Sequence, residues 1–243
     1  MKRFVLAASM AALVCGCSTY TTPGSGVVLG SIVEGDSDIA ATMARQPAIA
    51  FPARIAVVRV ASPGYSSRSN SSVGDGAFGI VTARDIETDE SLGRLERMPQ
   101  VAAVAPVSRL LVPAHLTNTR DLRTAAAQLR ADVVLIYTID TRFRTESAEV
   151  GPLQTIALGF LPTKKAVVNS TCAFIIIDVR TGFVYGTGET TATEDQRSNV
   201  WGSENAIEAA RLRAERRAFE DGLGEVAELW ASIVAEHGTR RPA

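Results

Sequence analysis

The chain has 243 residues, of which 25 are lysine or arginine and 26 are aspartate or glutamate, so its formal net charge is -1. Hydrophobic residues make up 46% and charged residues 21%, a composition that supports a folded core and excludes a disordered or fibrous chain. The near-neutral charge provides no overall field that would attract a nucleic acid, so we expect no nucleic-acid partner.

The amino-terminal residues have the layout of an export signal. Lys2 and Arg3 give a basic start, and an apolar run follows at positions 4–14. This run is shorter than the roughly 18–20 apolar residues of a membrane-spanning helix, and no later segment is apolar for as long. The sequence therefore predicts a signal segment and no transmembrane helix.

The end of this segment, Val14-Cys15-Gly16-Cys17, resembles the lipobox of bacterial lipoproteins, in which Gly or Ala precedes the modified cysteine. The resemblance implies a signal peptide over 1–16, cleavage between Gly16 and Cys17, and lipid attachment (diacylglyceryl and N-acyl chains, such as palmitate) at Cys17. Cys15 is the competing candidate, but it would place the bulky Val14 where the pattern has Gly or Ala. Acyl chains on Cys17 would anchor the protein to its membrane.

Sorting and redox state follow from the same resemblance. Ser18 stands where lipoproteins retained at the inner membrane tend to have Asp, which implies the outer membrane with the domain facing the periplasm. With Cys15 removed and Cys17 acylated, Cys172 has no intramolecular partner, so we expect no disulfide. Cys172 lies in an alternating strand pattern, which favours a buried, inert thiol over a reactive one.

Residues 17–47 are predicted to form a flexible tether with a short helix at 37–45, followed by one compact domain at 48–236 and a disordered tail at 237–243. Residues 64–79 are rich in Ser, Gly and Asn and are predicted to be a loop. Hydrophobic periodicity predicts strands at 54–61, 101–107, 132–144, 165–177 and 183–193, and helices at 87–98, 119–129 and 203–236. We expect Gly222 and Gly224 to divide the last helix.

This order predicts an α/β fold with a mixed sheet, in which a β-α-β-α-β unit is followed by an antiparallel meander and a long C-terminal helix. Asp178 to Gly182 is predicted to be a hairpin turn with a positive φ at Gly182. Gly186 and Gly188 lack the third glycine of a dinucleotide loop, and we expect them to allow close packing against the sheet.

Three segments, 54–58, 131–139 and 177–185, occur in an order similar to that of the curli-secretion (CsgG-type) and TolB amino-terminal superfamily of envelope domains. The Asp-Val-Arg-Thr-Gly hairpin is the most distinctive of them. The resemblance covers about residues 50–235. It implies an envelope domain, because members of the superfamily include secretion pores and outer-membrane lipoproteins that activate cell-wall synthases.

The sequence contains no recognisable catalytic constellation. His115 and His237 are the two histidines, and their separation does not match a metal site. A loop position is favoured for His115 over a role as a lone base. Glu34 and its acidic neighbours lack the remaining ligands of a calcium loop, which favours a solvated turn. We therefore expect no enzyme, cofactor or metal.

The expected function is that of a non-enzymatic binding or assembly module for another component of the cell envelope, an envelope protein of unspecified identity. The candidate partner surface lies where the third strand emerges from the core, at Arg142 and Arg144. It continues in the apolar segment 151–162, which contains Ile156, Leu158 and Phe160. Packing of that segment on its own core is the alternative.

An oligomeric CsgG-like secretion pore is the alternative function, and an enzyme with an unrecognised site is a third. Such a pore requires strands of about 9–11 residues with an apolar face toward lipid. Segment 64–79 is too polar and segment 151–162 is too short to supply them. These departures favour the binding module.

Overall fold

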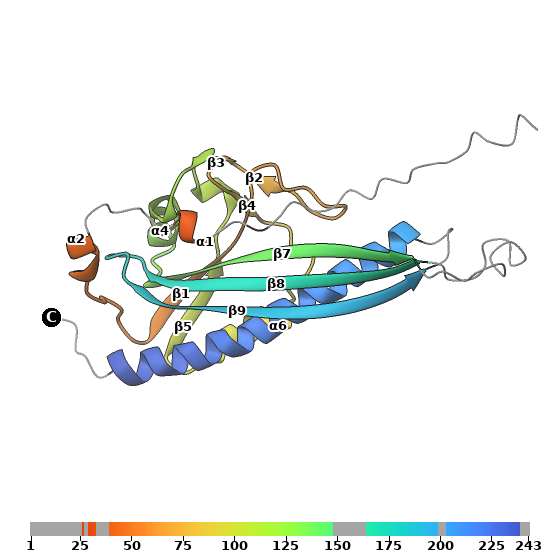
Figure 1. The fold of residues 1–243 in the computed structure, drawn as a ribbon. Coiled ribbons are helices and arrows are strands. Elements are labelled where there is room, and N and C mark those ends of the chain that lie inside the picture. Colours follow the sequence, from red (N-terminus) through yellow and green to blue (C-terminus); the bar gives the residue numbers. More distant parts are fainter. Residues whose placement is uncertain (1–25, 27–28, 33–38, 148–163, 199–202, 239–243) are drawn as a thin grey trace, which may run out of the picture.

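The computed structural model describes residues 26, 29–32, 39–147, 164–198 and 203–238 (Figure 1). Its helices are α1 (Leu29–Ile32), α2 (Ile39–Met43), α3 (Asp89–Glu96), a 3-10 turn (Arg109–Leu111), α4 (Thr119–Gln128) and α6 (Ser203–His237). Its strands are β1 (Ala53–Ala61), β2 (Ser72–Val73), β3 (Asp75–Gly76), β4 (Gly79–Val81), β5 (Val101–Pro106), β6 (His115–Leu116), β7 (Val133–Ser147), β8 (Lys164–Asp178) and β9 (Val184–Ser198).

The main sheet is mixed, with the strand order β2-β4-β1-β7-β8-β9, and β5 also pairs with β1. Strand β1 runs parallel to β5 and β7, whereas β7, β8 and β9 are successive antiparallel neighbours. This arrangement confirms the predicted fold class. Eight of the nine β1 residues are buried because helices cover both faces of the sheet there, and the β-branched run of β1 fits that environment.

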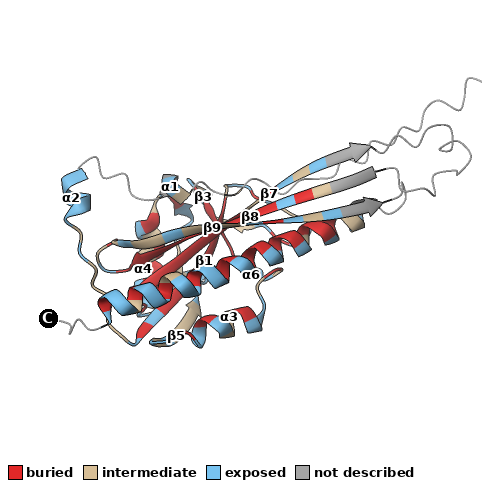
Figure 2. Ribbon diagram, turned by 60° about the horizontal axis from the view of Figure 1, so that its bottom comes forward, coloured by how far each residue is buried: buried red, intermediate tan, exposed pale blue. Residues whose placement is uncertain are grey.

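The sheet separates two hydrophobic cores. On one face α3 and α6 pack through Leu95 and Trp230, and on the other face α4 packs through Leu122 and Ala125. Figure 2 shows buried residues along the side of α6 that faces the sheet and exposed residues along its outer side. No helix in the described part of the chain is long and apolar enough to cross a membrane.

Helix α4 begins with a capping box. The Asn118 side chain accepts a hydrogen bond from the Arg120 amide, and the Asp121 side chain accepts one from the Asn118 amide. These contacts satisfy amide groups that have no partner within the helix. The cap is therefore Asn118, immediately ahead of the helix predicted to begin at residue 119.

Helix α6 continues without a break, so the predicted division at Gly222 and Gly224 is wrong. A Cβ atom at Gly222 would lie 3.3 Å from the Cys172 sulfur, which means that the glycine lets the helix approach β8 closely. The predicted role of Gly186 in close packing is confirmed, because a Cβ there would lie 2.7 Å from the Leu229 side chain.

The hairpin between β8 and β9 also forms as predicted. Gly182 has a φ of 72°, and one carboxylate oxygen of Asp178 accepts hydrogen bonds from the amides of Arg180 and Thr181. His237 was expected at the start of a disordered tail, but it is the last residue of α6 and is buried. Its ring packs against Tyr185 with a centroid distance of 5.6 Å.

The segment predicted as a loop at 64–79 contains structure. Strands β2 and β3 lie within it, and β4 begins at Gly79 and pairs antiparallel with β1. Periodicity did not indicate these strands because β2 and β3 have only two residues each, and β3 pairs with the distant strand β6.

Beyond Tyr137, the last β7 residue that pairs with β1, the strands β7, β8 and β9 continue as a narrow three-stranded extension. We call residues 138–147, 164–173 and 189–198 the arm. The amino-terminal part of α6 packs on one face of the arm, and Figure 1 views the arm from its other face. The alternation predicted along β7 is confirmed, since Thr141 is buried while Arg142 and Arg144 are exposed.

The chain ahead of β1 packs on the domain at several points. A Cβ atom at Gly26 would lie 3.0 Å from the Thr138 hydroxyl, and Leu29 packs against the core on the α4 side. Arg45 donates to the Gly182 carbonyl, and the Ala48 amide donates to Asp178. Among the described residues, contact with the domain thus begins at Gly26, earlier than the domain boundary predicted at 48.

Candidate functional site: the open face of the arm

Some of the predicted site residues lie outside the described part of the chain, and others lie on the surface of the arm. Cys17 and the preceding Gly16 lie outside the described residues, as do Ile156, Leu158 and Phe160. Arg142 and Arg144 are described, and both are exposed on the face of the arm opposite α6.

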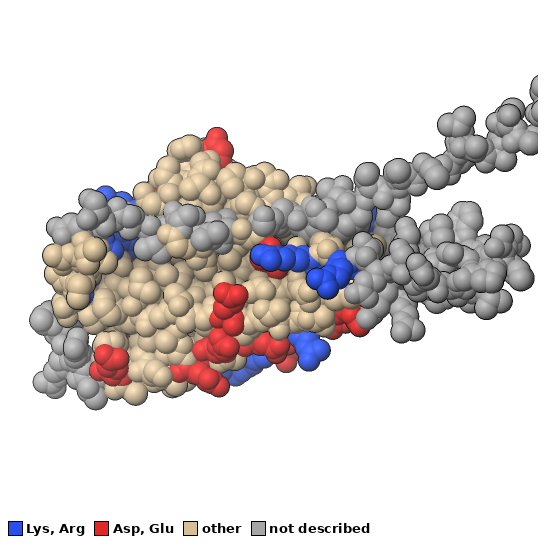
Figure 3. Space-filling view, viewed as in Figure 1, with Lys and Arg blue, Asp and Glu red and all other residues tan. Residues whose placement is uncertain are grey.

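We call this surface the open face. Its described residues come from alternate positions of three strands and are mostly hydroxyl-bearing or charged: Thr138, Asp140, Arg142, Arg144, Asn169, Thr171, Ala173, Glu189, Thr191 and Thr193. In Figure 3, acidic and basic side chains lie close together on the side of the molecule that carries the arm. The open face is thus polar and carries charges of both signs.

Cross-strand hydrogen bonds order the open face. The hydroxyl groups of Thr171 and Thr191 lie 2.9 Å apart, and the Thr193 hydroxyl donates to the Asn169 amide oxygen at 2.7 Å. Arg142 donates to Asp140 at 3.3 Å along the same strand. Such pairs hold side chains in fixed positions on a pleated surface.

A hollow of about 770 Å³ lies over this face. It is lined by Arg142, Asn169 and Thr191 together with Gly26 and Leu29 of the amino-terminal segment. Thr138 is buried although it belongs to the open face, because Gly26 lies directly against it. The volume falls within the range of ligand pockets, but the hollow is open to solvent and its floor is the surface of the sheet.

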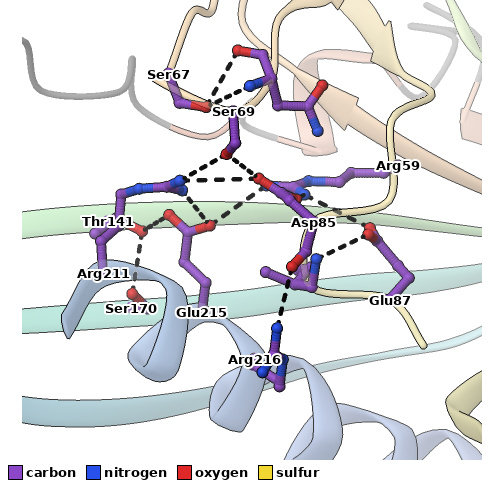
Figure 4. A network of polar contacts seen from close by, with 12 residues as sticks. Arg59, Ser67, Ser69, Asp85, Glu87, Thr141, Ser170, Arg211, Glu215 and Arg216 are labelled. Carbon is purple, nitrogen blue, oxygen red and sulfur yellow. Dashed lines mark hydrogen bonds and ion pairs between the residues drawn. The ribbon is translucent and has the colours of Figure 1, made fainter. Parts of the chain in front are cut away.

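The opposite side of the arm contains a buried cluster of charges (Figure 4). Arg59 of β1 lies 2.9 Å from Asp85 and 3.5 Å from Glu87, and Arg211 of α6 lies 2.7 Å from Glu208. Both guanidinium groups also contact Glu215, at 3.6 Å from Arg59 and 2.7 Å from Arg211. We call these six residues the ionic cluster.

Neutral side chains complete the hydrogen bonds of the ionic cluster. The Ser69 hydroxyl donates to Asp85 at 2.8 Å and accepts from Arg211 at 3.1 Å. The Thr141 hydroxyl donates to Glu215 at 2.8 Å, which links the cluster to β7. Buried charges are tolerated when they are paired and hydrogen-bonded in this way.

The surroundings of Asp85, Arg59 and Arg211 shift the pKa values of their side chains. Burial alone would raise the pKa of Asp85, but Arg59, the Ser69 hydroxyl and Arg211 together lower it below its usual value. Burial alone would lower the pKa of Arg59 and of Arg211, but the neighbouring carboxylates raise both above the ordinary arginine value. Both guanidinium groups and the Asp85 carboxylate are therefore charged at neutral pH.

The ionic cluster adjoins the carboxyl ends of the parallel strands, where α/β proteins commonly bind ligands. Tyr137 donates a hydrogen bond to Glu87 there, and burial together with the Glu87 charge raises the pKa of Tyr137 well above its usual value. The space beside Arg59 and Tyr137 is about 50 Å³, enough for one or two water molecules. The cluster therefore joins α6 to the sheet, and the space beside Arg59 and Tyr137 is too small for an ordinary substrate.

The remaining chemical candidates lie apart from one another. His115 is exposed, and its Nδ1 lies 3.0 Å from an oxygen of Asp75. Cys172 is buried, as predicted. Within the described ranges, no group of three His, Cys, Asp or Glu residues is placed to hold a metal ion.

Sequence reasoning missed the ionic cluster. Arg59 lies in an apolar strand pattern, and the sequence does not show that Asp85 meets it. The detectable signal was on α6, where Arg211 and Glu215 share a helical face with the apolar residues Ala214 and Ala218. Charged residues within an apolar stripe indicate buried ion pairs.

No known protein family and no characterised protein matches this sequence. Solved structures with a partial likeness include a Xanthomonas campestris protein of the DUF330 family, at 15% identity over 76% of this chain and 90% of that one, with a TM-score of 0.35. They also include the lipoprotein GNA1162 of Neisseria meningitidis, at 15% identity over 67% and 96%, with a TM-score of 0.32. Both TM-scores are below 0.5, so neither likeness indicates a function for this chain.

Proposed function

We propose that the chain is a lipoprotein anchored to the periplasmic face of the outer membrane through Cys17, and that it acts as a non-enzymatic binding module for another envelope protein. The observation that carries this proposal is the arm, whose three strands expose one ordered polar face to solvent. The Val14-to-Cys17 pattern supports the anchor. We place the domain in the CsgG/TolB-like superfamily as part of the same proposal.

The open face has the properties of a protein-binding surface. Its residues are held by cross-strand hydrogen bonds, so binding would cost little ordering of side chains. Arg142 and Arg144 provide charged groups for specificity. Segment 151–162 lies between β7 and β8 in the sequence, outside the described residues, and we include its Ile156, Leu158 and Phe160 in the proposed surface.

A binding role also agrees with the chemistry of the buried groups. The charged residues on the α6 side pair with one another, and the space beside Arg59 and Glu87 is only about 50 Å³. Ligand pockets of enzymes are typically about 300–1,000 Å³ and contain convergent polar groups. We therefore assign the ionic cluster to holding the arm in place, and the open face to the partner.

Site-specific photo-cross-linking in cells tests this proposal. A photoreactive residue at Thr191, on the open face, is expected to give a discrete adduct, whereas one at Ser232, on the outer side of α6, is expected to give none. Arg142→Ala combined with Arg144→Ala should weaken the Thr191 adduct. Equal adducts at both positions, or an adduct that is unchanged in the double variant, would contradict the proposed surface.

The mass of the detergent-extracted protein provides a second test. A binding module is expected to be a small particle of one or two chains when its partner is absent. A ring of many subunits, measured by light scattering after subtraction of the detergent, would favour the secretion pore instead.

A further inference from the structure

We propose that the lipid tether ends at Gly26, so that the open face works close to the membrane surface and its partner is an integral protein of that same membrane. This inference rests on the proposed anchor at Cys17. The observation behind it is the contact between Gly26 and β7, because this contact limits the tether to the residues between Cys17 and Gly26.

The contact requires glycine. A Cβ atom at position 26 would lie 3.0 Å from the Thr138 hydroxyl and 3.1 Å from the carbonyl carbon and oxygen of Ile139. These distances are shorter than ordinary van der Waals contacts, and two of the three atoms are backbone atoms that cannot rotate away. A larger side chain would therefore push the chain off the sheet.

Neighbouring contacts hold the same segment. Leu29 packs against the core that contains α4, and α1 contacts β8. Farther along, the Ala48 amide donates to Asp178 at 2.7 Å, and Arg45 donates to the Gly182 carbonyl. The described residues between Gly26 and β1 are thus held against the domain near both ends of this stretch, which leaves the part ahead of Gly26 as the tether.

The remaining reach is short. From Cys17 to Gly26 there are nine steps along the chain (26 - 17 = 9), which span at most ~32 Å when fully extended. A tether that continued to Ala48 would have 31 steps (48 - 17 = 31) and would reach ~110 Å. The Gly26 contact therefore removes more than two thirds of the reach.

This restriction identifies the class of partner. Gly26 lies on the same face as the hollow over Arg142, Asn169 and Thr191, so the anchor point and the open face are on one side of the arm. A protein embedded in the outer membrane is then within range of the open face. A partner fixed deeper in the periplasm would require the longer tether.

Energy transfer from the protein to the bilayer tests the distance. The acylated full-length protein, with a donor dye on Thr191→Cys, is reconstituted into phosphatidylcholine vesicles that contain a rhodamine-labelled lipid as acceptor. Cys172 is buried and Cys17 is blocked by acylation, so the introduced thiol is the one that reacts. A spacer of twenty Gly and Ser residues after Ser18 adds up to ~70 Å of maximum reach and ~25 Å of average end-to-end distance, and we expect it to lower the transfer efficiency.

Two variants separate the Gly26 contact from other effects. Gly26→Leu should lower the transfer efficiency in the direction of the spacer variant. Gly30→Leu is the matched control, because a Cβ atom there has no neighbour within 4 Å and the transfer should stay at the wild-type value. Equal transfer in wild type and in Gly26→Leu, or in wild type and the spacer variant, would overturn the inference.

The partner class has its own readout. For this test the Thr191 adduct is formed in cells with a Cys17→Ala variant that carries an independent export signal. The adduct is expected to stay in the membrane pellet after carbonate extraction, because the partner itself would be embedded in the membrane. Release of that adduct would overturn the assignment to an integral protein. If the wild-type protein does not sediment with vesicles, the lipid anchor itself is refuted. If it sediments but the spacer leaves the transfer efficiency unchanged, only the role of Gly26 is refuted.

Discussion

Arg59 of β1 and Glu215 of α6 lie 3.6 Å apart in the interior of the protein, each with its side chain almost completely buried. This ion pair joins the central strand of the sheet to the long helix at the base of the arm. Among the described residues, a small apolar cluster that includes Val168 and Ala214 also packs between the arm and α6. Polar and apolar contacts therefore share the attachment between α6 and the arm.

Removing one cation from the ionic cluster should be strongly destabilising. Arg211→Met leaves Glu208 and Glu215 buried without their main partner, and breaking such a network typically costs about 3–5 kcal/mol. Urea unfolding followed by circular dichroism measures the loss. Arg213→Met is the control, because Arg213 forms a half-exposed pair with Glu194 and its removal should cost about 1 kcal/mol or less. Similar losses for the two variants would show that the cluster does not hold α6.

Acid should weaken the protein through Asp85. The folded-state pKa of this carboxyl is lowered from an ordinary value of 3.8, so its stabilising contribution is complete above that value and is lost as pH falls through the folded pKa. Thermal unfolding from neutral pH to below pH ~4 should show a smaller loss of Tm in Asp85→Asn than in wild type. Asp89→Asn, at a fully exposed side chain, should follow the wild-type profile. Parallel profiles for wild type and Asp85→Asn would contradict this assignment.

Cys172 should be inert in the native protein. Burial raises the pKa of the thiol to about 12. Arg59 lowers this pKa, and the charges of Glu87 and Glu225 raise it further. Maleimide labelling at neutral pH is expected only after denaturation, whereas an exposed thiol in Thr191→Cys should react at once. Rapid labelling of native wild-type protein at Cys172 would show that α6 separates from the sheet.

The two glycines of α6 should respond in opposite ways to alanine. Gly224 has open space around its Cβ position, so Gly224→Ala should stabilise the helix by about 0.5–1 kcal/mol. Gly222 faces Thr190 and Cys172 at 3.2–3.3 Å, so Gly222→Ala should destabilise the protein by displacing the helix. Chemical denaturation of both variants measures these changes. Stabilisation by both would contradict the close helix–sheet contact.

Local patterns were sufficient to predict much of the fold. Alternation along β7 predicted the wet face at Arg142 and Arg144, and the turn residues before Gly182 predicted the hairpin. The expected break in α6 was wrong because tertiary packing against β8 outweighs the low helix propensity of Gly222.

The parts that were missed depend on contacts between distant segments. Arg59 and Glu215 are adjacent only after the sheet and α6 have formed, and neither has a local pattern that identifies the other. Gly26 likewise gives no sign in the sequence that it lies against Thr138. The candidate arm surface was thus predictable in part from strand periodicity, whereas the contact that limits the tether was not.

The central claim, a lipid anchor at Cys17 that positions the arm, is tested most directly by mass spectrometry of the amino-terminal peptide from isolated outer membranes. We predict a peptide that begins at Cys17 and carries the mass of its acyl chains, and a Cys17→Ala protein, exported by an independent signal, that carbonate extraction releases from the membranes. An amino-terminal peptide with an unmodified Cys17, recovered from the soluble fraction, would contradict it.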